Sequence, residues 1–209
     1  MLRTSAGVGL LHWTALAVVM AGQDYFPENV KYDPKIPTPK SYFGFEVGER
    51  HLQHHELVGY MKRLAETSDR VALQEYARSY GGRPLIMLTI TSPENHQRLG
   101  DVRALHLRLA DPDESPGVSL EKLPAVVNMG YGVHGNEPSA SNAAPLAAYH
   151  LAAGQGEEIA AMLSEVVVLL DPCLNPDGFE RFAHWANNHR GAVANSDPNH
   201  REHREGWPS

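Results

Sequence analysis

The chain has 209 residues, of which 18 are Lys or Arg and 25 are Asp or Glu, so its formal net charge is −7. A hydrophobic fraction of 42% excludes a disordered chain, and the single cysteine excludes a disulfide-built miniprotein. The acidic balance argues against a general nucleic-acid binder, whereas the 12 histidines are numerous enough to raise the question of metal binding.

The first residues have the pattern of a secretory signal peptide. Arg3 is the only charged residue in 1–21, and a mostly apolar run covers residues 8–20. Val-Met-Ala at residues 19–21 offers small residues at the positions that a signal peptidase recognises. The run is shorter than the roughly 20 residues of a membrane-spanning helix. We expect cleavage of residues 1–21, which leaves 17 basic against 25 acidic residues, or −8, in an extracytoplasmic compartment, secreted or periplasmic. An uncleaved N-terminal membrane anchor is the alternative.

A proline-rich stretch comes next, over residues 22–42. Pro27, Pro34, Pro37 and Pro39 are spaced too closely for a helix or a central strand, so the stretch predicts an extended arm.

The rest of the chain alternates between helical and strand-like apolar spacing. Helices are predicted over residues 52–66, around 99–109, 138–153 and 157–164, and strands over 71–80, 84–91, 125–129 and 165–170. Gly81 and Gly82 favour a hairpin between the first two strands. We therefore expect an α/β fold with a mixed, mostly parallel, doubly wound sheet and helices on both faces, with functional groups at the carboxyl ends of the strands.

A first motif follows strand 125–129 directly and reads Gly-Tyr-Gly-Val-His-Gly-Asn-Glu-Pro. His134 and Glu137 can converge on one cation because Gly135 permits a turn between them, and nitrogen plus oxygen donors suit zinc. The spacing alone is a weak signal, since a loop histidine followed by a glutamate at a helix N-terminus has the same sequence pattern without binding a metal. The chain has no His-Glu-x-x-His signature.

A second motif, Asn-Pro-Asp-Gly at residues 175–178, follows strand 165–170. Proline at the second position and glycine at the fourth are typical of a tight turn. The turn does not explain why these residues again follow a strand, next in order after the strand that precedes His134.

The ordered pair of motifs resembles the zinc metallocarboxypeptidases of the carboxypeptidase A type. The resemblance covers roughly residues 50–205 and includes Gly-Arg-Pro-Leu at 82–85 and Asn-Pro-Asp-Gly-Phe-Glu-Arg at 175–181. It implies a secreted, bacterial-type member with a carboxypeptidase fold, acting on peptide substrates as a monomer, and it makes residues 43–209 the N-terminal part of a catalytic domain. It also makes His134 and Glu137 two ligands of a catalytic Zn²⁺, and Arg190 a catalytic and substrate-binding residue that stabilises the oxyanion. An ordinary surface arginine is the alternative for Arg190.

The resemblance also marks what this sequence changes or lacks. Asn136 stands where the digestive enzymes carry an arginine that binds the substrate's terminal carboxylate, so substrate binding at Asn136 must differ. The third ligand, a histidine, the general-base glutamate and an Asn-Arg clamp are expected beyond Ser209. In related bacterial sequences a stretch similar to residues 195–209 precedes that clamp. We therefore expect a truncated catalytic domain and an inactive 209-residue piece.

Other readings stay open. The Gly-x-His-Gly-Asn-Glu motif also resembles that of deacylases of the aspartoacylase type. A non-catalytic secreted binding domain on the same fold is a third possibility. A second metal cluster could use the histidines of the last helix and tail, although the alternating charges there favour a solvated loop: His184, His189, His200 and His203. His51, His54 and His55 are expected to be exposed, and Cys173 to be buried.

Overall fold

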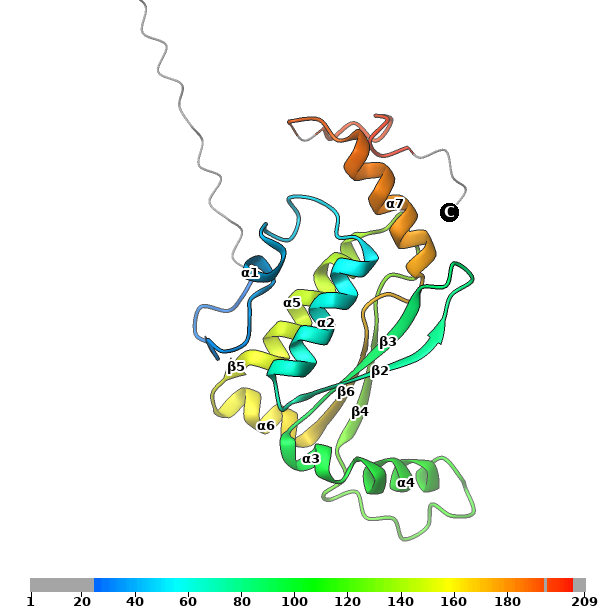
Figure 1. Ribbon diagram of the computed structural model, residues 1–209. Coiled ribbons are helices and arrows are strands. Elements are labelled where there is room, and N and C mark those ends of the chain that lie inside the picture. The colour runs from blue at the N-terminus through cyan, green and yellow to red at the C-terminus, as the bar shows by residue number, and fades with distance from the viewer. Residues whose placement is uncertain (1–24, 194, 205–209) are drawn as a thin grey trace, which may run out of the picture.

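The computed structural model describes residues 25–193 and 195–204 (Figure 1). The predicted signal peptide, residues 1–21, lies outside this part of the chain. Within the described residues, no helix is both long and apolar enough to cross a membrane.

A four-stranded sheet forms the centre, with the strands in the order β2-β3-β6-β4. Their bounds are β2 Val71–Arg78, β3 Pro84–Ile90, β4 Ala125–Gly130 and β6 Val166–Asp171. The β2–β3 hairpin predicted on the two glycines is confirmed, and β4 pairs with β6 in parallel. The α/β class and the mixed sheet are therefore confirmed. Of the three strand pairs in this four-stranded sheet, β4–β6 is parallel, whereas β2–β3 and β3–β6 are antiparallel, so the sheet is not mostly parallel in the part that the structure describes.

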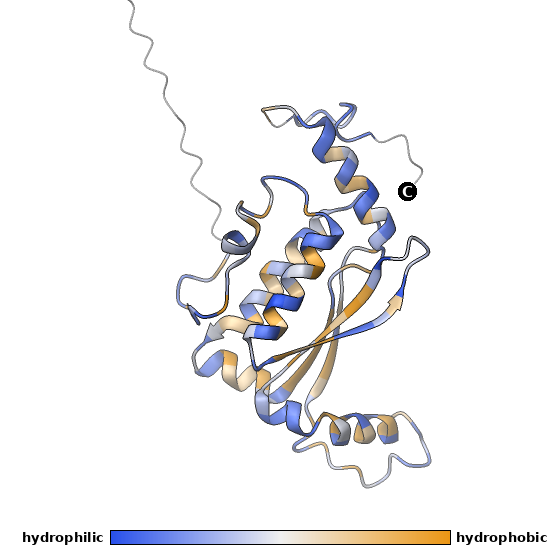
Figure 2. Ribbon diagram, viewed as in Figure 1, coloured by the Kyte–Doolittle hydropathy of each residue, from blue (hydrophilic) through white to orange (hydrophobic). Residues whose placement is uncertain are grey.

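Two long helices cover one face of this sheet and bury most of the core. Helix α2, His54–Thr67, and helix α5, Ser139–Ala153, lie side by side against the strands (Figure 1). Alternate residues of β3 and β6 point toward them, as expected for strands with two faces: Ile86, Leu88, Ile90, Val168 and Leu170. The apolar colouring of the strands in Figure 2 matches this burial.

The opposite face of the sheet is contacted by α4, Leu99–Leu109. Leu99, Val102 and Leu107 of this helix share a groove with the other set of alternating strand residues, including Val167 and Leu169. Helices on both faces are thus confirmed. The two shorter helices α3, Pro93–Gln97, and α6, Glu157–Glu165, flank the strands at the end remote from the loop that follows β4.

The proline-rich stretch is not simply extended, in contrast to the sequence-based prediction. Pro39 begins a short helix, α1 Pro39–Phe43, because proline is well tolerated at the first helical position and Thr38 caps it. Strand β1, Lys31–Tyr32, pairs with β5, Gly154–Gln155. The Tyr32 ring stacks on Tyr149 at 5.2 Å, which fixes this segment to α5.

The second motif starts a helix, which the sequence analysis did not predict. Helix α7 runs over Pro176–His189, with Asn175 as its N-cap: the Asn175 side chain accepts a hydrogen bond from Gly178 N at 3.0 Å. Asparagine at the cap, proline at the first position and aspartate in the first turn are helix-start signals as well as turn signals. The tight turn predicted at 175–178 is therefore the first turn of α7.

Candidate active site

The loops that follow β4 and β6 are hydrogen-bonded to each other. Tyr131 N donates to Asp171 O at 2.9 Å, Leu174 N donates to Tyr131 O at 2.8 Å, and Asn175 N donates to Gly132 O at 3.0 Å. Because β4 and β6 are parallel neighbours, both motifs lie at the same edge of the sheet, where ligand sites of α/β folds form.

Two glycines let the first motif pack this closely. Gly132 has φ +64°, and a Cβ atom on it would lie 2.0 Å from the Ser141 hydroxyl. Gly135 contacts the backbone of Gly178 in α7, where a Cβ atom would lie 2.0 Å from the carbonyl carbon. The loop is thus fixed between α5 and α7 at positions where no larger residue fits.

The loop presents His134, Asn136 and Glu137 on the surface. All three are exposed, and Glu137 N donates to His134 O at 3.2 Å, so one turn brings the two candidate ligands together along the backbone. An imidazole nitrogen and a carboxylate oxygen are donors that zinc accepts. No group of three potential metal-binding side chains occurs in residues 25–193 and 195–204, so the described chain offers this pair and not a complete site.

Asp177 of the second motif binds the β2–β3 hairpin. Its carboxylate accepts hydrogen bonds from Ser79 Oγ at 2.8 Å, from Gly81 N at 2.9 Å and from Arg83 Nη1 at 2.7 Å. Burial opposes ionisation of this carboxylate, but the three donors outweigh burial and hold the pKa of Asp177 below its ordinary value. Gly-Arg-Pro-Leu and Asn-Pro-Asp-Gly, which the sequence analysis noted separately, are thus parts of one contact.

Arg190 lies at the C-terminal end of α7, where its guanidinium donates to Glu49 O at 2.6 Å. It lines a cavity of about 420 Å³ together with Pro138 and Ser139, the two residues that follow Glu137. His134, Asn136 and Glu137 are not among the residues that line this cavity. The structure therefore brings Arg190 to the start of α5, next to the candidate ligand turn.

The buried Asp171 bonds Tyr76, which is 44% exposed, and the sequence did not predict this pair. The Tyr76 hydroxyl donates to Asp171 Oδ2 at 2.5 Å, and Cys173 N donates to Asp171 Oδ1 at 3.0 Å. Burial raises the pKa of Asp171, and it also raises the pKa of Tyr76, where the hydrogen bond to Asp171 adds to the shift. Tyr76 is the extra residue of a bulge in β2, so its side chain leaves the regular alternation of the strand.

The remaining residues singled out in the sequence have structural settings. Cys173 is buried as predicted, and burial raises the pKa of its thiol to about 11, which leaves it protonated and unreactive near neutral pH. His55 is exposed as predicted, but His51 is half-buried and His54 is buried, because both pack beneath α7: His54 N donates to Glu180 Oε2 at 2.6 Å.

The histidines of α7 and the tail do not gather around one point. The His189 ring stacks on Trp185 with centroids 3.9 Å apart, and the His203 ring bonds Asn195 O at 2.7 Å. The second metal cluster that the sequence left open is therefore not formed within residues 25–193 and 195–204.

Comparison with known proteins gives one family. The family model described as zinc carboxypeptidase matches residues 57–209. No curated protein sequence matches the chain.

Solved structures also match, at low similarity. Thrombin-activatable fibrinolysis inhibitor aligns with a TM-score of 0.46 and 14% identity, over 72% of this chain and 30% of that one. The bovine form of that protein, in complex with tick carboxypeptidase inhibitor, aligns with a TM-score of 0.40 and 14% identity. This alignment covers 63% of this chain and 33% of that one. Carboxypeptidase A from Helicoverpa armigera aligns with a TM-score of 0.43 and 20% identity, over 62% of this chain and 25% of that one. The chain thus spans a third or less of the length of each of these structures.

Proposed function

Because the chain belongs to the zinc carboxypeptidase family, we propose that it carries part of the active site of a zinc-dependent peptidase that hydrolyses peptide bonds at or near C-termini. The supporting observation is the turn of His134 and Glu137 at the carboxyl end of β4, which is held by hydrogen bonds to the loop after β6. In this proposal His134 Nδ1 or Nε2 and a Glu137 carboxylate oxygen bind Zn²⁺.

The residues of this chain would act by binding and orientation. Bound zinc supplies Lewis-acid chemistry that activates water and polarises a carbonyl group. The Arg190 guanidinium would donate hydrogen bonds to the negative charge that develops on the scissile carbonyl oxygen, and Asn136 would bind the substrate backbone or terminus. Arg190 Nη1 donates to Glu49 O, so the other N–H groups of the guanidinium would make these hydrogen bonds.

A catalytic zinc normally has three protein ligands. Since the described residues provide a pair, we propose that the third ligand and the general base lie outside the described part of the chain. The pair of His134 and Glu137 by itself should then bind zinc weakly.

Calorimetric zinc titration of this chain tests the ligand assignment. His134→Ala and Glu137→Gln should each weaken zinc binding about tenfold or more, whereas His55→Ala, at an exposed position of α2, should leave it unchanged. Equal zinc affinity in all four proteins would contradict the assignment.

Activity is tested on the complete gene product with three sets of compounds. Peptides with free C-termini should be hydrolysed and the same peptides with amidated C-termini should be poor substrates. Turnover of small N-acyl amino acids instead would favour a deacylase of the aspartoacylase type, and turnover of neither would favour a non-catalytic binding domain.

We also propose that the protein acts outside the cytoplasm after removal of residues 1–21. The pattern of these residues supports this proposal. N-terminal sequencing of the protein from its native host should find Gly22 as the first residue, and a retained Met1 in the membrane fraction would favour an anchor.

A further inference from the structure

The candidate ligand turn, residues 133–137, is held to the rest of the molecule through its backbone. Gly135 is the buried residue of this turn, and the other four residues are exposed. It packs against the backbone of Gly178 in the first turn of α7, where a Cβ atom on Gly135 would lie 2.0 Å from the carbonyl carbon. The exposed side chains of His134 and Glu137 therefore take their position from a backbone that rests on α7.

Two hydrogen bonds join the loop before this turn to the residues that begin α7. Leu174 N donates to Tyr131 O at 2.8 Å, and Asn175 N, at the N-cap of α7, donates to Gly132 O at 3.0 Å. The contacts to the loop and to the turn thus come from residues 174–178. The position of the candidate ligand turn depends on how this end of α7 is held.

The β2–β3 hairpin holds this end of α7 through the carboxylate of Asp177. Arg83 Nη1 donates to Asp177 Oδ1 at 2.7 Å, Ser79 Oγ donates to the same oxygen at 2.8 Å, and Gly81 N donates to Oδ2 at 2.9 Å. Figure 1 shows the hairpin beside the N-terminal end of α7. Since Asp177 directly precedes Gly178, the hairpin and the candidate ligand turn contact α7 at adjacent positions.

The tip of the hairpin is shaped around the ion pair of Arg83 and Asp177. A Cβ atom on Gly81 would lie 2.5 Å from both Arg83 Nη1 and Asp177 Oδ1, so the pair fills the space beside this glycine. Arg83 N donates to Ser79 Oγ at 3.1 Å, and Ser79 N donates to Arg83 O at 2.9 Å, which closes the tip on itself. Charge-assisted hydrogen bonds between side chains fixed in this way are stronger than those of a solvated surface pair.

We infer that Arg83 and Asp177 are positioning residues for the proposed zinc ligands. Their ion pair fixes the first turn of α7, and the contact of Gly178 with Gly135 passes this constraint to the candidate ligand turn. Ligands that are already in place bind a metal more tightly, because less conformational freedom is lost on binding. That the turn binds zinc rests on the proposed function, whereas the ordering of the turn by the ion pair does not.

Backbone order in the metal-free 209-residue chain tests the ion pair directly. We would measure ¹⁵N order parameters of Gly135, Asn136 and Glu137 by NMR in the presence of EDTA. Values of about 0.85 in the wild type should fall to about 0.6 or lower in Arg83→Met and in Asp177→Asn. Order parameters of the native state report local motion on the picosecond-to-nanosecond timescale. A loss of global stability alone would therefore leave them unchanged.

Arg78→Met is the matched control on the same hairpin. Arg78 forms an ion pair with Glu75 at 2.8 Å and donates to Gly82 O at 2.8 Å, so both partners lie within the hairpin. Its substitution should leave the order parameters of the candidate ligand turn at their wild-type values. Arg83→Lys keeps the charge and one donor, which suffices for a contact made through Nη1 alone, and should restore most of the order that Arg83→Met removes.

Calorimetric zinc titration connects the order of the turn with metal binding. Arg83→Met and Asp177→Asn should each weaken zinc binding about tenfold, as substitutions outside the ligand shell do. The double variant should bind zinc no more weakly than either single variant, because both substitutions break the same contact. Arg78→Met should bind zinc as the wild type does.

Three results would overturn the inference. They are unchanged order parameters in both variants, zinc affinity that stays at the wild-type value while the turn becomes flexible, and a double variant whose loss of affinity is the product of the two single losses. If Asp177→Asn does not fold, Ser79→Ala, which removes one donor to the carboxylate, must lower the order parameters instead. A wild-type chain that binds no zinc rejects the proposed function, and the metal-free order parameters then still decide whether the ion pair positions this turn.

Discussion

Gly135 and Gly178 face each other so closely that a Cβ atom on Gly135 would lie 2.0 Å from the carbonyl carbon of Gly178. The contact joins the candidate ligand turn to the first turn of α7, two segments that are more than 40 residues apart in the sequence. The position of His134 and Glu137 relative to α7 therefore depends on the missing side chain at residue 135.

Gly135→Ala should destabilise the protein by about 1–3 kcal/mol, the usual cost of overpacking, because backbone atoms on both sides cannot move far. Urea unfolding followed by circular dichroism measures the change. Gly100→Ala is the matched control: a Cβ atom there meets open space inside α4, so the free energy of unfolding should rise by about 0.5–1 kcal/mol. Equal effects of the two substitutions would contradict the role given to the Gly135 contact.

Asp177→Asn should lower stability by about 1 kcal/mol near neutral pH, because it weakens three hydrogen bonds at a partly exposed site. The sign of the pH dependence follows from the lowered pKa of Asp177. Its contribution is present above the unfolded-state value, about 4, and is lost as the pH falls through the folded-state pKa. The difference in melting temperature between the wild type and the variant should thus shrink as the pH falls from 6 to 2.5. Asp113→Asn, in an exposed loop, should show no such difference.

Tyr76→Phe should destabilise the protein by about 1–2 kcal/mol at pH 7, since it removes a donor from the buried Asp171 carboxylate. Burial raises the pKa of Asp171, so the folded state is favoured when this group is protonated, and that contribution is lost as the pH rises through the folded-state pKa. The cost of Tyr76→Phe should therefore be smaller at pH 4 than at pH 7.

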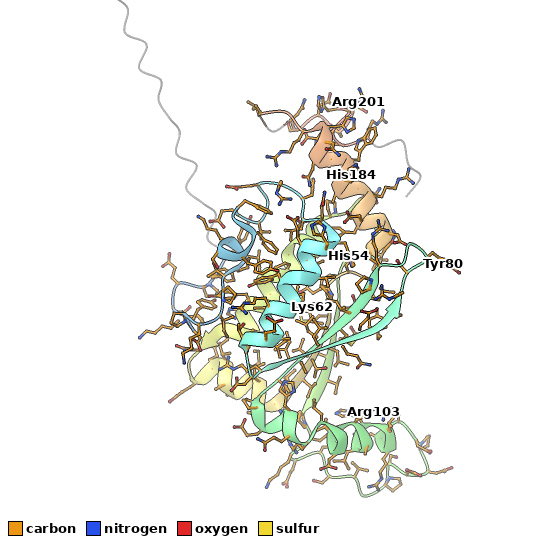
Figure 3. All side chains as sticks on the ribbon, in the orientation of Figure 1. His54, Lys62, Tyr80, Arg103, His184 and Arg201 are labelled. Carbon is orange, nitrogen blue, oxygen red and sulfur yellow. The ribbon has the colours of Figure 1, made fainter. Side chains whose placement is uncertain are left out.

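Tyr80→Phe is the control for this experiment. Tyr80 lies at the tip of the same hairpin and is fully exposed (Figure 3). Its substitution should change stability by less than about 0.5 kcal/mol. A pH-independent cost at Tyr76, or an equal cost at Tyr80, would show that the hydrogen bond to Asp171 does not stabilise the fold.

The regular elements could be predicted from the sequence where local patterns dominate. The spacing of apolar residues predicted α2, Leu99–Leu109 and the β2–β3 hairpin, because burial on one face imposes that spacing. Strand direction was harder: the apolar run of β6 suits a buried strand of either direction, and its antiparallel pairing with β3 depends on the path of the whole chain. Helix α7 was missed because its N-cap Asn175 and its first three residues also have the sequence of a tight turn.

The candidate site was predictable only in its linear motifs. His134 and Glu137 are three residues apart, so a pattern could find them, and the structure places them in one turn. The Tyr76–Asp171 pair joins residues 95 positions apart through a bulge, and the His51–Asn187 contact joins residues 136 positions apart. Neither pair leaves a periodic signal, because such contacts depend on tertiary packing and not on local spacing.

Arg190→Ala should lower kcat of the zinc-loaded complete gene product by about 10²–10³, the range found when a single oxyanion donor is removed. Stability should change by less than about 1 kcal/mol, because the substitution breaks one exposed hydrogen bond to Glu49 O. Arg103→Ala on α4, at the opposite end of the molecule in Figure 3, should leave kcat unchanged. The measurements are kcat and KM on a peptide with a free C-terminus, together with the melting temperature of each variant. If kcat is retained, or falls only in step with the folded fraction, Arg190 serves to hold the segment before α2 and does not contact the reacting carbonyl.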